Sequence, residues 1–208
     1  MAQQSRDGTP LVNPMFYLYP SDSNTFSLDL QYFYGPGLLV APVVDEGATA
    51  VDVYLPNDVF YDYYTHKRIQ GRGRTFTVSN QNLTDIPLFI RGGVIIPVRA
   101  GAESAMTTTA LRKRDFELLI PLGADETAAG DLYIDDGESI VSKGVTNIQF
   151  AYTRGVVKAR GQFGFNTPVR IKKVTVLGAK GKNRDGKGEE TVVEVDQPLN
   201  GEWELRVE

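Results

Sequence analysis

Polar and apolar residues alternate along most of this chain after residue 45. The period-two pattern appears in short segments at 51–55, 75–78, 116–120, 132–134, 148–152, 156–159, 169–177, 191–195 and 203–207. Because successive side chains of a strand point to opposite faces, each segment is predicted to form a half-buried antiparallel strand. Strands at this spacing, separated by Gly and Pro, are typical of sandwiches or barrels. We find no amphipathic helix of normal length after residue 45 and no internal repeat.

The first 45 residues have a different character. Two aromatic-rich segments, Met15–Tyr19 and Gln31–Tyr34, precede a nearly continuous apolar run at Gly37–Val44. A run without alternation indicates a strand buried on both faces, as in a parallel sheet or an α/β barrel. A parallel α/β domain cannot be built from 45 residues, because one crossover unit alone takes roughly 30. These residues are therefore expected to be the end of something larger, with a boundary near residues 44–48.

The most distinctive segment is Ile86–Arg99. Two apolar runs, at 88–90 and 94–96, flank Arg91-Gly92-Gly93. The apolar runs predict buried strands, and the glycine pair permits a positive φ and a close backbone approach between them. We predict two strands turned at Gly92-Gly93, at the join between β-domains, with Arg91 as a buried ion-pair partner in preference to a substrate ligand.

Two further segments are predicted to lie outside the sheets. The small, polar, threonine-rich stretch Ala100–Thr109 marks a second boundary. Gly178–Glu190 is charged and glycine-rich, which predicts a hairpin loop or a mobile insertion.

Composition excludes several classes of function. The chain has 208 residues, of which 41% are hydrophobic and 23% charged, so a sizeable core is available. A net charge of −4 argues against a general nucleic-acid binder, and the basic clusters Arg112–Arg114 and Lys180–Lys187 are interpreted as solvated surface. No apolar run approaches the ~20 residues that span a membrane. The chain has no cysteine, which excludes disulfides and thiolate metal sites.

The candidate catalytic groups carry little signal. The one histidine, His66, adjoins two cations in a predicted hairpin turn, so a solvated histidine is favoured over the base of a hydrolytic triad. The carboxylate pairs Asp45-Glu46 and Asp135-Asp136 are adjacent, and neighbours on a strand point to opposite faces, so neither pair should converge on one substrate atom. Asp131–Glu138 does not match a calcium loop and indicates a strand ending in an Asp-Gly turn. We therefore assign no catalytic, cofactor-binding or metal-binding residue.

Two surface features are candidates for carbohydrate. Tyr61, Tyr63 and Tyr64 are candidates for stacking on sugar rings, although core packing plus an aromatic cluster on a sheet face is the favoured alternative. Asn82 begins the sequon Asn82-Leu83-Thr84, a candidate for N-glycosylation.

Five motifs in order carry a family resemblance. They lie at 8–20, 31–43, 51–64, 86–97 (with its Arg-Gly-Gly and Ile-Ile-Pro) and 132–139. Together they resemble the C-terminal portion of glycoside hydrolase family 31, the α-glucosidase family. The residue-by-residue sequence, including Thr107–Thr109 before Phe116, is most similar to that of secreted fungal α-glucosidases.

The resemblance implies a mainly β fold with three segments. Residues 1–45 would be the last segment of a (β/α)8 catalytic barrel, 46–100 a proximal C-terminal β-domain, and 101–208 a distal C-terminal β-sandwich domain. It also implies a retaining mechanism with an aspartate nucleophile and an aspartate acid/base. In the family both aspartates, and the histidine and arginine that grip the substrate, lie upstream of the counterpart of Gly8, so no catalytic residue is carried over.

The resemblance implies that this chain functions as one part of a larger enzyme. The resemblance implies a retaining α-glucosidase that hydrolyses terminal α-linked glucose from maltose, malto-oligosaccharides or starch-type glucans. This chain would complete the barrel and buttress it, would be inactive alone, and would meet the α-glucoside only through the assembled enzyme. Its expected partner is the N-terminal catalytic portion of the same enzyme as a second chain, whether the chain is a processing product, a separate subunit or a truncated fragment. Neither nucleic acid nor membrane is an expected partner, and an extracellular location is expected from the family resemblance alone.

Two alternatives come from other classes. One is a stand-alone carbohydrate-binding β-sandwich that uses the Tyr61–Tyr64 aromatics, and the other is a non-catalytic interaction protein. The first 45 residues argue against a free binding module, which has no use for a half-built barrel edge. Alone, the chain is expected to expose an apolar surface between Met15 and Val44.

Overall fold

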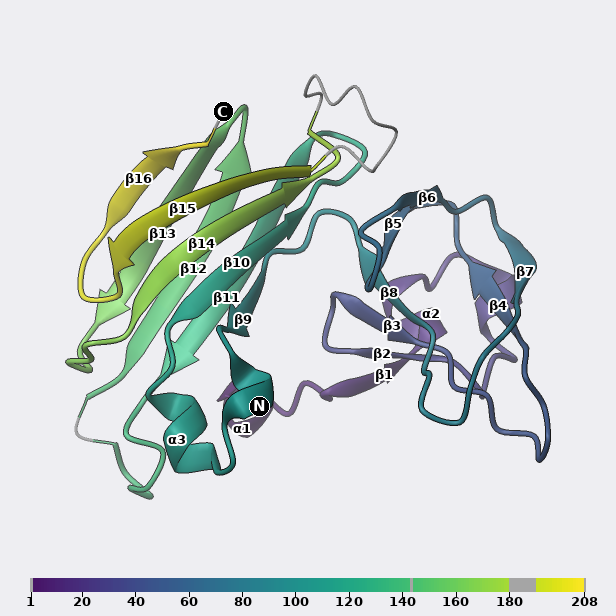
Figure 1. Cartoon of the computed structure of the whole chain (residues 1–208), viewed down its shortest axis with the longest axis horizontal. Coiled ribbons are helices and arrows are strands. Elements are labelled where there is room, and N and C mark those ends of the chain that lie inside the picture. Colours follow the sequence, from purple (N-terminus) through teal and green to yellow (C-terminus); the bar gives the residue numbers. More distant parts are fainter. Residues whose placement is uncertain (1, 143, 180–189, 208) are drawn as a thin grey trace. The chain divides into compact units, whose positions relative to one another are not determined.

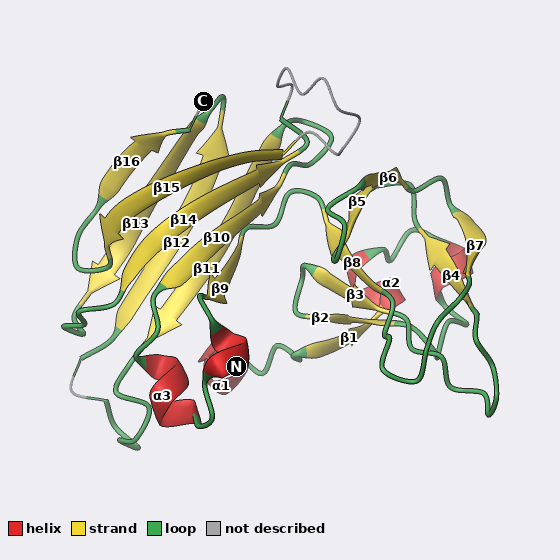
Figure 2. Ribbon diagram, viewed as in Figure 1, coloured by secondary structure: helices red, strands yellow, loops and turns green. Residues whose placement is uncertain are grey.

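The computed structural model describes residues 2–142, 144–179 and 190–207, which form two compact units. Unit 1 is Met1–Gly92 and unit 2 is Gly93–Glu208 (Figure 1). Strands dominate both units and the helices are short (Figure 2), which confirms the predicted mainly β fold. Among the described residues, no helix has the length and apolar character needed to cross a membrane.

Unit 1 is built around a six-stranded antiparallel sheet. Its strand order is β1-β2-β3-β8-β5-β6, with β1 (Val12–Pro14), β2 (Tyr32–Tyr34), β3 (Leu38–Val40), β8 (Leu88–Arg91), β5 (Val59–Asp62) and β6 (Arg68–Gln70). A second sheet pairs β4 (Val51–Leu55) with β7 (Arg74–Val78). The short helices are α1 (Ala2–Asp7), α2 (Met15–Leu18) and the 3₁₀ turn η1 (Ser23–Thr25). The core of the unit consists of Met15, Phe33, Leu39, Ala41, Val53, Leu55, Phe60 and Phe89.

The apolar run Gly37–Val44 yields a short antiparallel strand, which differs from the parallel pairing that its composition suggested. Only Leu38–Val40 joins the sheet, and it pairs antiparallel with β2 on one side and β8 on the other. The physical reason is the turn before it: Gly35, at φ +61, reverses the chain directly after β2, and a tight hairpin permits only antiparallel pairing. Met15–Leu18, an aromatic-rich segment, is helical.

Strands from residues 12–40 and 59–91 therefore share one sheet in this structure. The sheet is joined across the boundary predicted near residue 45 by the pairing of β3 with β8. The assignment of residues 1–45 to a barrel, and with it the division at 45 and 100, stays a prediction.

The distinctive segment Ile86–Arg99 crosses from one unit to the other. β8 ends at Arg91 in unit 1, whereas β9 (Ile96–Arg99) pairs with β10 in unit 2. The two strands do not pair with each other at Gly92-Gly93, whereas the prediction that the segment lies at the join between two β-units is confirmed. Both edges of β8 are already occupied by β3 and β5, so no edge is left for β9. The glycine pair instead carries the chain across the boundary, with Gly93 at φ +86.

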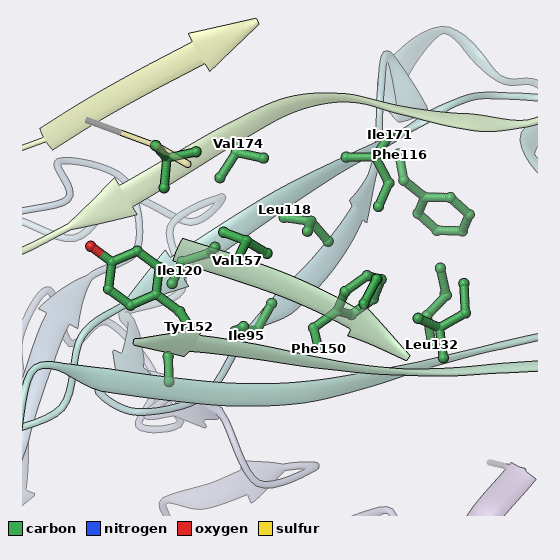
Figure 3. Packing of buried hydrophobic residues seen from close by; sticks show 14 of the residues in the cluster. Ile95, Phe116, Leu118, Ile120, Leu132, Phe150, Tyr152, Val157, Ile171 and Val174 are labelled. Carbon is green, nitrogen blue, oxygen red and sulfur yellow. The ribbon is translucent and has the colours of Figure 1, made fainter. Parts of the chain in front are cut away.

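Unit 2 is a sandwich of two four-stranded sheets. One sheet has the order β15-β14-β10-β9, with β15 (Glu190–Pro198), β14 (Arg170–Leu177) and β10 (Phe116–Pro121). The other has the order β11-β12-β13-β16, with β11 (Thr127–Ile134), β12 (Thr146–Thr153), β13 (Val156–Phe163) and β16 (Trp203–Arg206). Side chains of both sheets meet in one core, in which Leu118 and Val174 face Phe150 and Val157 (Figure 3). Before β10 lie the 3₁₀ turn η2 (Ala102–Ser104) and the helix α3 (Thr108–Arg112).

Every alternating segment predicted from the sequence overlaps a strand, which confirms those assignments. One pairing differs from the antiparallel expectation: β10 and β14 are parallel. Between them the chain builds β11, β12 and β13 of the opposite sheet, and such a crossover can return in the same direction. Residues 180–189 of the predicted loop Gly178–Glu190, which include the whole basic cluster Lys180–Lys187, lie outside the described residues, whereas Glu190 is the first residue of β15.

Candidate functional site

A polar cluster of Tyr19, Asp58 and Arg91 joins three segments of unit 1. Arg91 Nε lies 3.1 Å from Asp58 Oδ2, and the Tyr19 hydroxyl donates a 2.8 Å hydrogen bond to the same oxygen. The Arg91 guanidinium carbon lies 5.2 Å from the centre of the Tyr19 ring. The remaining oxygen of Asp58 accepts a 2.8 Å bond from the Val59 amide, so both carboxylate oxygens have partners. This confirms the predicted ion pair of Arg91, but the side chain is 29% exposed and therefore not buried as predicted.

The electrostatics of this cluster favour a structural role. Burial raises the pKa of Tyr19 above its usual range, and the Asp58 carboxylate raises it further while the Arg91 guanidinium lowers it. The phenol therefore stays protonated and donates to Asp58 across the ordinary pH range. The cluster fixes the residue after α2 to the residue that precedes β5 and to the last residue of β8.

A second polar cluster holds η1 and the start of β2 against β4. Gln31 is buried, and its side chain bonds the backbone of Tyr54 twice, through Nε2 to the carbonyl oxygen at 2.9 Å and through Oε1 from the amide at 2.8 Å. The Tyr54 hydroxyl donates to Asp22 Oδ2 at 2.7 Å. Burial raises the pKa of Tyr54, and the bond to Asp22 adds to the rise. The sequence analysis assigned no role to the Gln31 side chain, although residue 31 begins one of the five motifs, because its partner Tyr54 lies 23 residues further along the chain.

The three candidate tyrosines lie in different environments. Tyr61 is 1% exposed inside unit 1, so its ring packs in the interior, where a sugar cannot stack on it. Tyr63 and Tyr64 are 36% and 63% exposed, with ring centres 5.3 Å apart and planes at 87°. The Tyr64 hydroxyl donates to the Ile86 carbonyl oxygen at 3.0 Å. A sugar contact at Tyr63 and Tyr64 stays a prediction.

His66 occupies the predicted hairpin turn, between β5 and β6. Its backbone has φ +57, and its amide donates to the Asp62 carbonyl at 2.9 Å. The Asp62 carboxylate accepts 2.7 Å bonds from the amide and the hydroxyl of Thr65, which stabilises the turn. The geometry is that of a loop histidine, as the sequence indicated.

Asn82 lies exposed in the loop between β7 and β8. Its side-chain nitrogen donates to Asp85 Oδ2 at 2.9 Å. Glycosylation of Asn82 stays a prediction.

The adjacent carboxylate pairs lie in loops, so the expectation that strand geometry separates their side chains does not apply. β3 ends at Val40 and β11 ends at Ile134, before either pair begins. Asp136 accepts bonds from the hydroxyl and amide of Ser139 and from the Glu138 amide, and these bonds lower its pKa to about 2. Asp135 accepts from the amide of Gly137, which sits at φ +66, as in the predicted Asp-Gly turn. Among the described residues, no group of three or more His, Asp or Glu side chains is placed to hold a metal ion.

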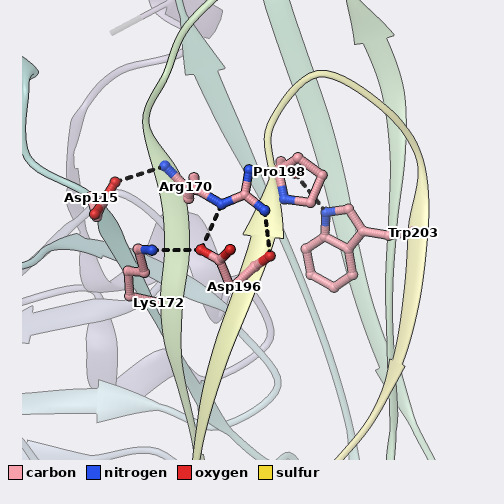
Figure 4. Close-up of polar contacts among 6 residues, drawn as sticks. All are labelled: Asp115, Arg170, Lys172, Asp196, Pro198 and Trp203. Carbon is pink, nitrogen blue, oxygen red and sulfur yellow. Dashed lines mark hydrogen bonds and ion pairs between the residues drawn. The ribbon is translucent and has the colours of Figure 1, made fainter.

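In unit 2 an exposed charge cluster ties β14 to β15 (Figure 4). Asp196 Oδ1 accepts from Arg170 Nε at 2.6 Å and from Lys172 Nζ at 2.5 Å. Both bonds lower the pKa of Asp196, and the bond from Lys172 has the larger effect. The Arg170 amide donates to Asp115 Oδ1 at 2.8 Å. The cluster fastens neighbouring strands and, like the clusters of unit 1, has the arrangement of a structural contact.

Comparisons with known proteins agree over both units. Residues 8–96 match the family model described as glycosyl hydrolase family 31 C-terminal domain. A probable alpha/beta-glucosidase (agdC) of Aspergillus fumigatus is 53% identical over 176 residues, which cover 85% of this chain and 20% of that protein. The probable alpha/beta-glucosidase agdC of Aspergillus oryzae is 46% identical over 209 residues, which cover 99% of this chain and 24% of that protein.

A solved structure adds the fold. The glucosidase II alpha subunit bound to alpha3-Glc2 superposes with a TM-score of 0.84 at 27% identity, covering 100% of this chain and 26% of that chain. The chain spans about a fifth of the length of the curated relatives that it matches.

Proposed function

The chain corresponds to the C-terminal portion of glycosyl hydrolase family 31 enzymes, and from this premise we propose that it is the C-terminal part of a retaining α-glucosidase. The whole enzyme hydrolyses terminal α-linked glucose from maltose, malto-oligosaccharides or starch-type glucans. The role of this chain is structural: it buttresses the catalytic portion.

The observation that carries this proposal is the extent of the match. Identity of 46% over 99% of the chain includes unit 1, the boundary at Gly92-Gly93 and unit 2. A relative that shared only one domain would match one unit. Both units therefore belong to one enzyme architecture, which supports a glucosidase part over a free binding module.

The side chains described above support the assignment of catalysis to the preceding portion. Asp58, Asp136 and Asp196 each accept several hydrogen bonds from neighbouring groups in the fold. A glycosidase nucleophile or acid/base must instead face the anomeric carbon or the glycosidic oxygen. The contacts of these carboxylates hold loops and strands, which is the work of a buttress.

The test is an assay by parts. This chain alone is expected to be inactive on maltose and on p-nitrophenyl α-glucoside. Adding the preceding portion of the same enzyme, produced as a second chain, is expected to give activity that neither chain shows alone. Turnover by this chain alone would contradict the assignment of the catalytic carboxylates.

An extracellular location and a glycan on Asn82 form the finer part of the proposal. The exposure of Asn82 supports access by a glycosyltransferase, and the location rests on the resemblance to secreted fungal enzymes. Enzymatic deglycosylation of the protein from its natural host is expected to lower its mass, and Asn82→Gln to abolish that loss. The whole enzyme is expected in the culture medium, and its retention inside the cell would oppose the location.

A further inference from the structure

Three aromatic side chains form an exposed cluster on unit 1, here named the aromatic patch: Phe16, Tyr17 and Phe26. Phe16 and Tyr17 belong to α2, and Phe26 follows η1 directly. The three are 38%, 59% and 59% exposed. The Phe16 ring centre lies 5.9 Å from that of Tyr17 and 6.3 Å from that of Phe26. Scattered exposed apolar residues are normal, but a cluster of aromatic rings on a surface marks an interaction site.

Buried neighbours hold the patch in place. Met15, which starts α2, is fully buried in the core of unit 1, and Tyr19 is bonded to Asp58. Thr25, next to Phe26, is also fully buried, and its hydroxyl donates to the Asp22 carbonyl at 2.7 Å. The exposed rings therefore sit on fixed backbone, and little conformational entropy is lost when a partner covers them.

The charge of the segment that carries the patch restricts its occupant. Residues 7–66 contain eight acidic residues and no lysine or arginine. An anionic membrane surface and a second copy of the same acidic segment would both be repelled. A suitable occupant is an apolar protein surface with a neutral or basic rim.

The length of the relatives identifies that occupant. The chain covers 20% to 24% of the fungal relatives, and the patch lies inside the segment that matches a C-terminal domain. Most of such an enzyme therefore precedes the counterpart of this chain. We propose that the aromatic patch is the docking surface of this chain for the preceding, catalytic portion of the same enzyme. This inference rests on the proposed function.

The test combines Tyr17→Ser with Phe26→Ser in the complete chain. The matched control combines Leu83→Ser with Met106→Ser, which removes side chains that are 104% and 91% exposed elsewhere. Each chain is titrated into the preceding portion of the enzyme, and hydrolysis of p-nitrophenyl α-glucoside is followed. The patch variant is expected to need at least about tenfold more chain for half-maximal activity, with unchanged turnover at saturation, because truncating central aromatic contacts has effects of this size. The control is expected to match the wild type.

A second measurement separates the possible failures. The same substitutions in the enzyme as one polypeptide are expected to lower its thermal midpoint, while the lone chain unfolds at an unchanged midpoint and binds less hydrophobic dye. Equal titration midpoints and equal thermal midpoints would overturn the docking surface and leave the proposed function standing. An inactive wild-type single polypeptide would overturn the proposed function. Loss of self-association in sedimentation, with normal complementation, would assign the patch to a second copy and also overturn the proposal.

Discussion

The two units of this chain differ in how completely they bury their apolar side chains. In the part of the chain that the structure describes, the core of unit 2 contains nineteen buried residues and the core of unit 1 contains eight. Among the described residues, eleven large hydrophobic side chains are exposed on unit 1 and four on unit 2. Unit 2 thus has the organisation of a self-sufficient sandwich. Unit 1 leaves more of its apolar surface exposed, which is what the proposed docking to the catalytic portion requires.

The largest effect is expected in the core of unit 2. Phe150 is 1% exposed and its ring centre lies 6.0 Å from that of Trp203. Phe150→Ala is expected to destabilise unit 2 by about 3–5 kcal/mol, because it removes a large buried ring and leaves a cavity. Denaturant unfolding followed by Trp203 fluorescence reports on this unit.

The control for this prediction is Val192→Ala, at a side chain that is 50% exposed. Its effect is expected to stay within about 0.5 kcal/mol. If Phe150→Ala were equally mild, the contrast between the two cores would lose its energetic basis.

The same contrast explains what the sequence could predict. Alternation located strands such as β11 and β12 because one face of each is buried and the other is not, and this leaves a local pattern that does not depend on the partner strand. Pairing is not local. Two similar apolar segments, Leu88–Arg91 and Ile96–Arg99, belong to different sheets. Their partner strands lie far away in the chain, so the local sequence does not identify them. The parallel pairing of β10 with β14 could likewise not be predicted from the sequence, since three strands of the other sheet lie between them along the chain.

The candidate site shows the same limit. Arg91 was predicted as an ion-pair partner, but its partners were not, because Asp58 lies 33 residues away and Tyr19 bonds Asp58 across 39 residues. Tyr61 and Tyr64 differ by three positions and share a side-chain type. Their exposures of 1% and 63% follow from the end of β5 at Asp62.

A second prediction concerns the Tyr19–Asp58–Arg91 cluster of unit 1. Asp58→Asn removes the charge that faces Arg91, and Asn is a weaker acceptor for the Tyr19 hydroxyl. Because the Arg91 and Asp58 side chains are 29% and 22% exposed, the loss is reduced by solvent, and we expect a destabilisation of unit 1 by about 1–2 kcal/mol. Tyrosine fluorescence during denaturant unfolding reports mainly on this unit, which contains eight of the ten tyrosines.

The matched control is Asp45→Asn, at an exposed loop position. It is expected to leave unit 1 unchanged. An equal effect of the two substitutions would mean that net charge, rather than the Tyr19–Asp58–Arg91 contacts, determines the stability.

A third prediction uses pH to separate the units further. The hydrogen bonds to Asp136 lower its pKa from 3.8 to about 2 in the folded protein. Between these two values the unfolded state binds more protons than the folded state, so this group's stabilisation is complete above about pH 4 and is lost as the pH falls through 2. Asp136→Asn is expected to make the acid-induced loss of stability of unit 2 shallower in this window, as followed by Trp203 fluorescence. A curve parallel to that of the wild type would show that the bonds to Ser139 and Glu138 do not couple to folding.

The smallest effect on stability is expected at Tyr64, an exposed side chain of unit 1 whose position is fixed by contacts within the unit. Tyr64 donates to the Ile86 carbonyl, and it contacts Tyr63 edge to face, so its ring is fixed although it is 63% exposed. Tyr64→Ala is expected to cost at most about 0.5–1 kcal/mol in stability, since the lost hydrogen bond is replaced by water.

If the ring stacks on sugars, retention of the lone chain on an amylose column is expected to fall about two- to tenfold, the usual range for a single aromatic contact. Tyr34→Ala, which removes a 48% exposed ring from β2, is the matched control and is expected to leave retention unchanged. Equal retention of wild type and Tyr64→Ala would remove carbohydrate binding from this part of unit 1, so that its exposed rings would be explained by protein contacts alone.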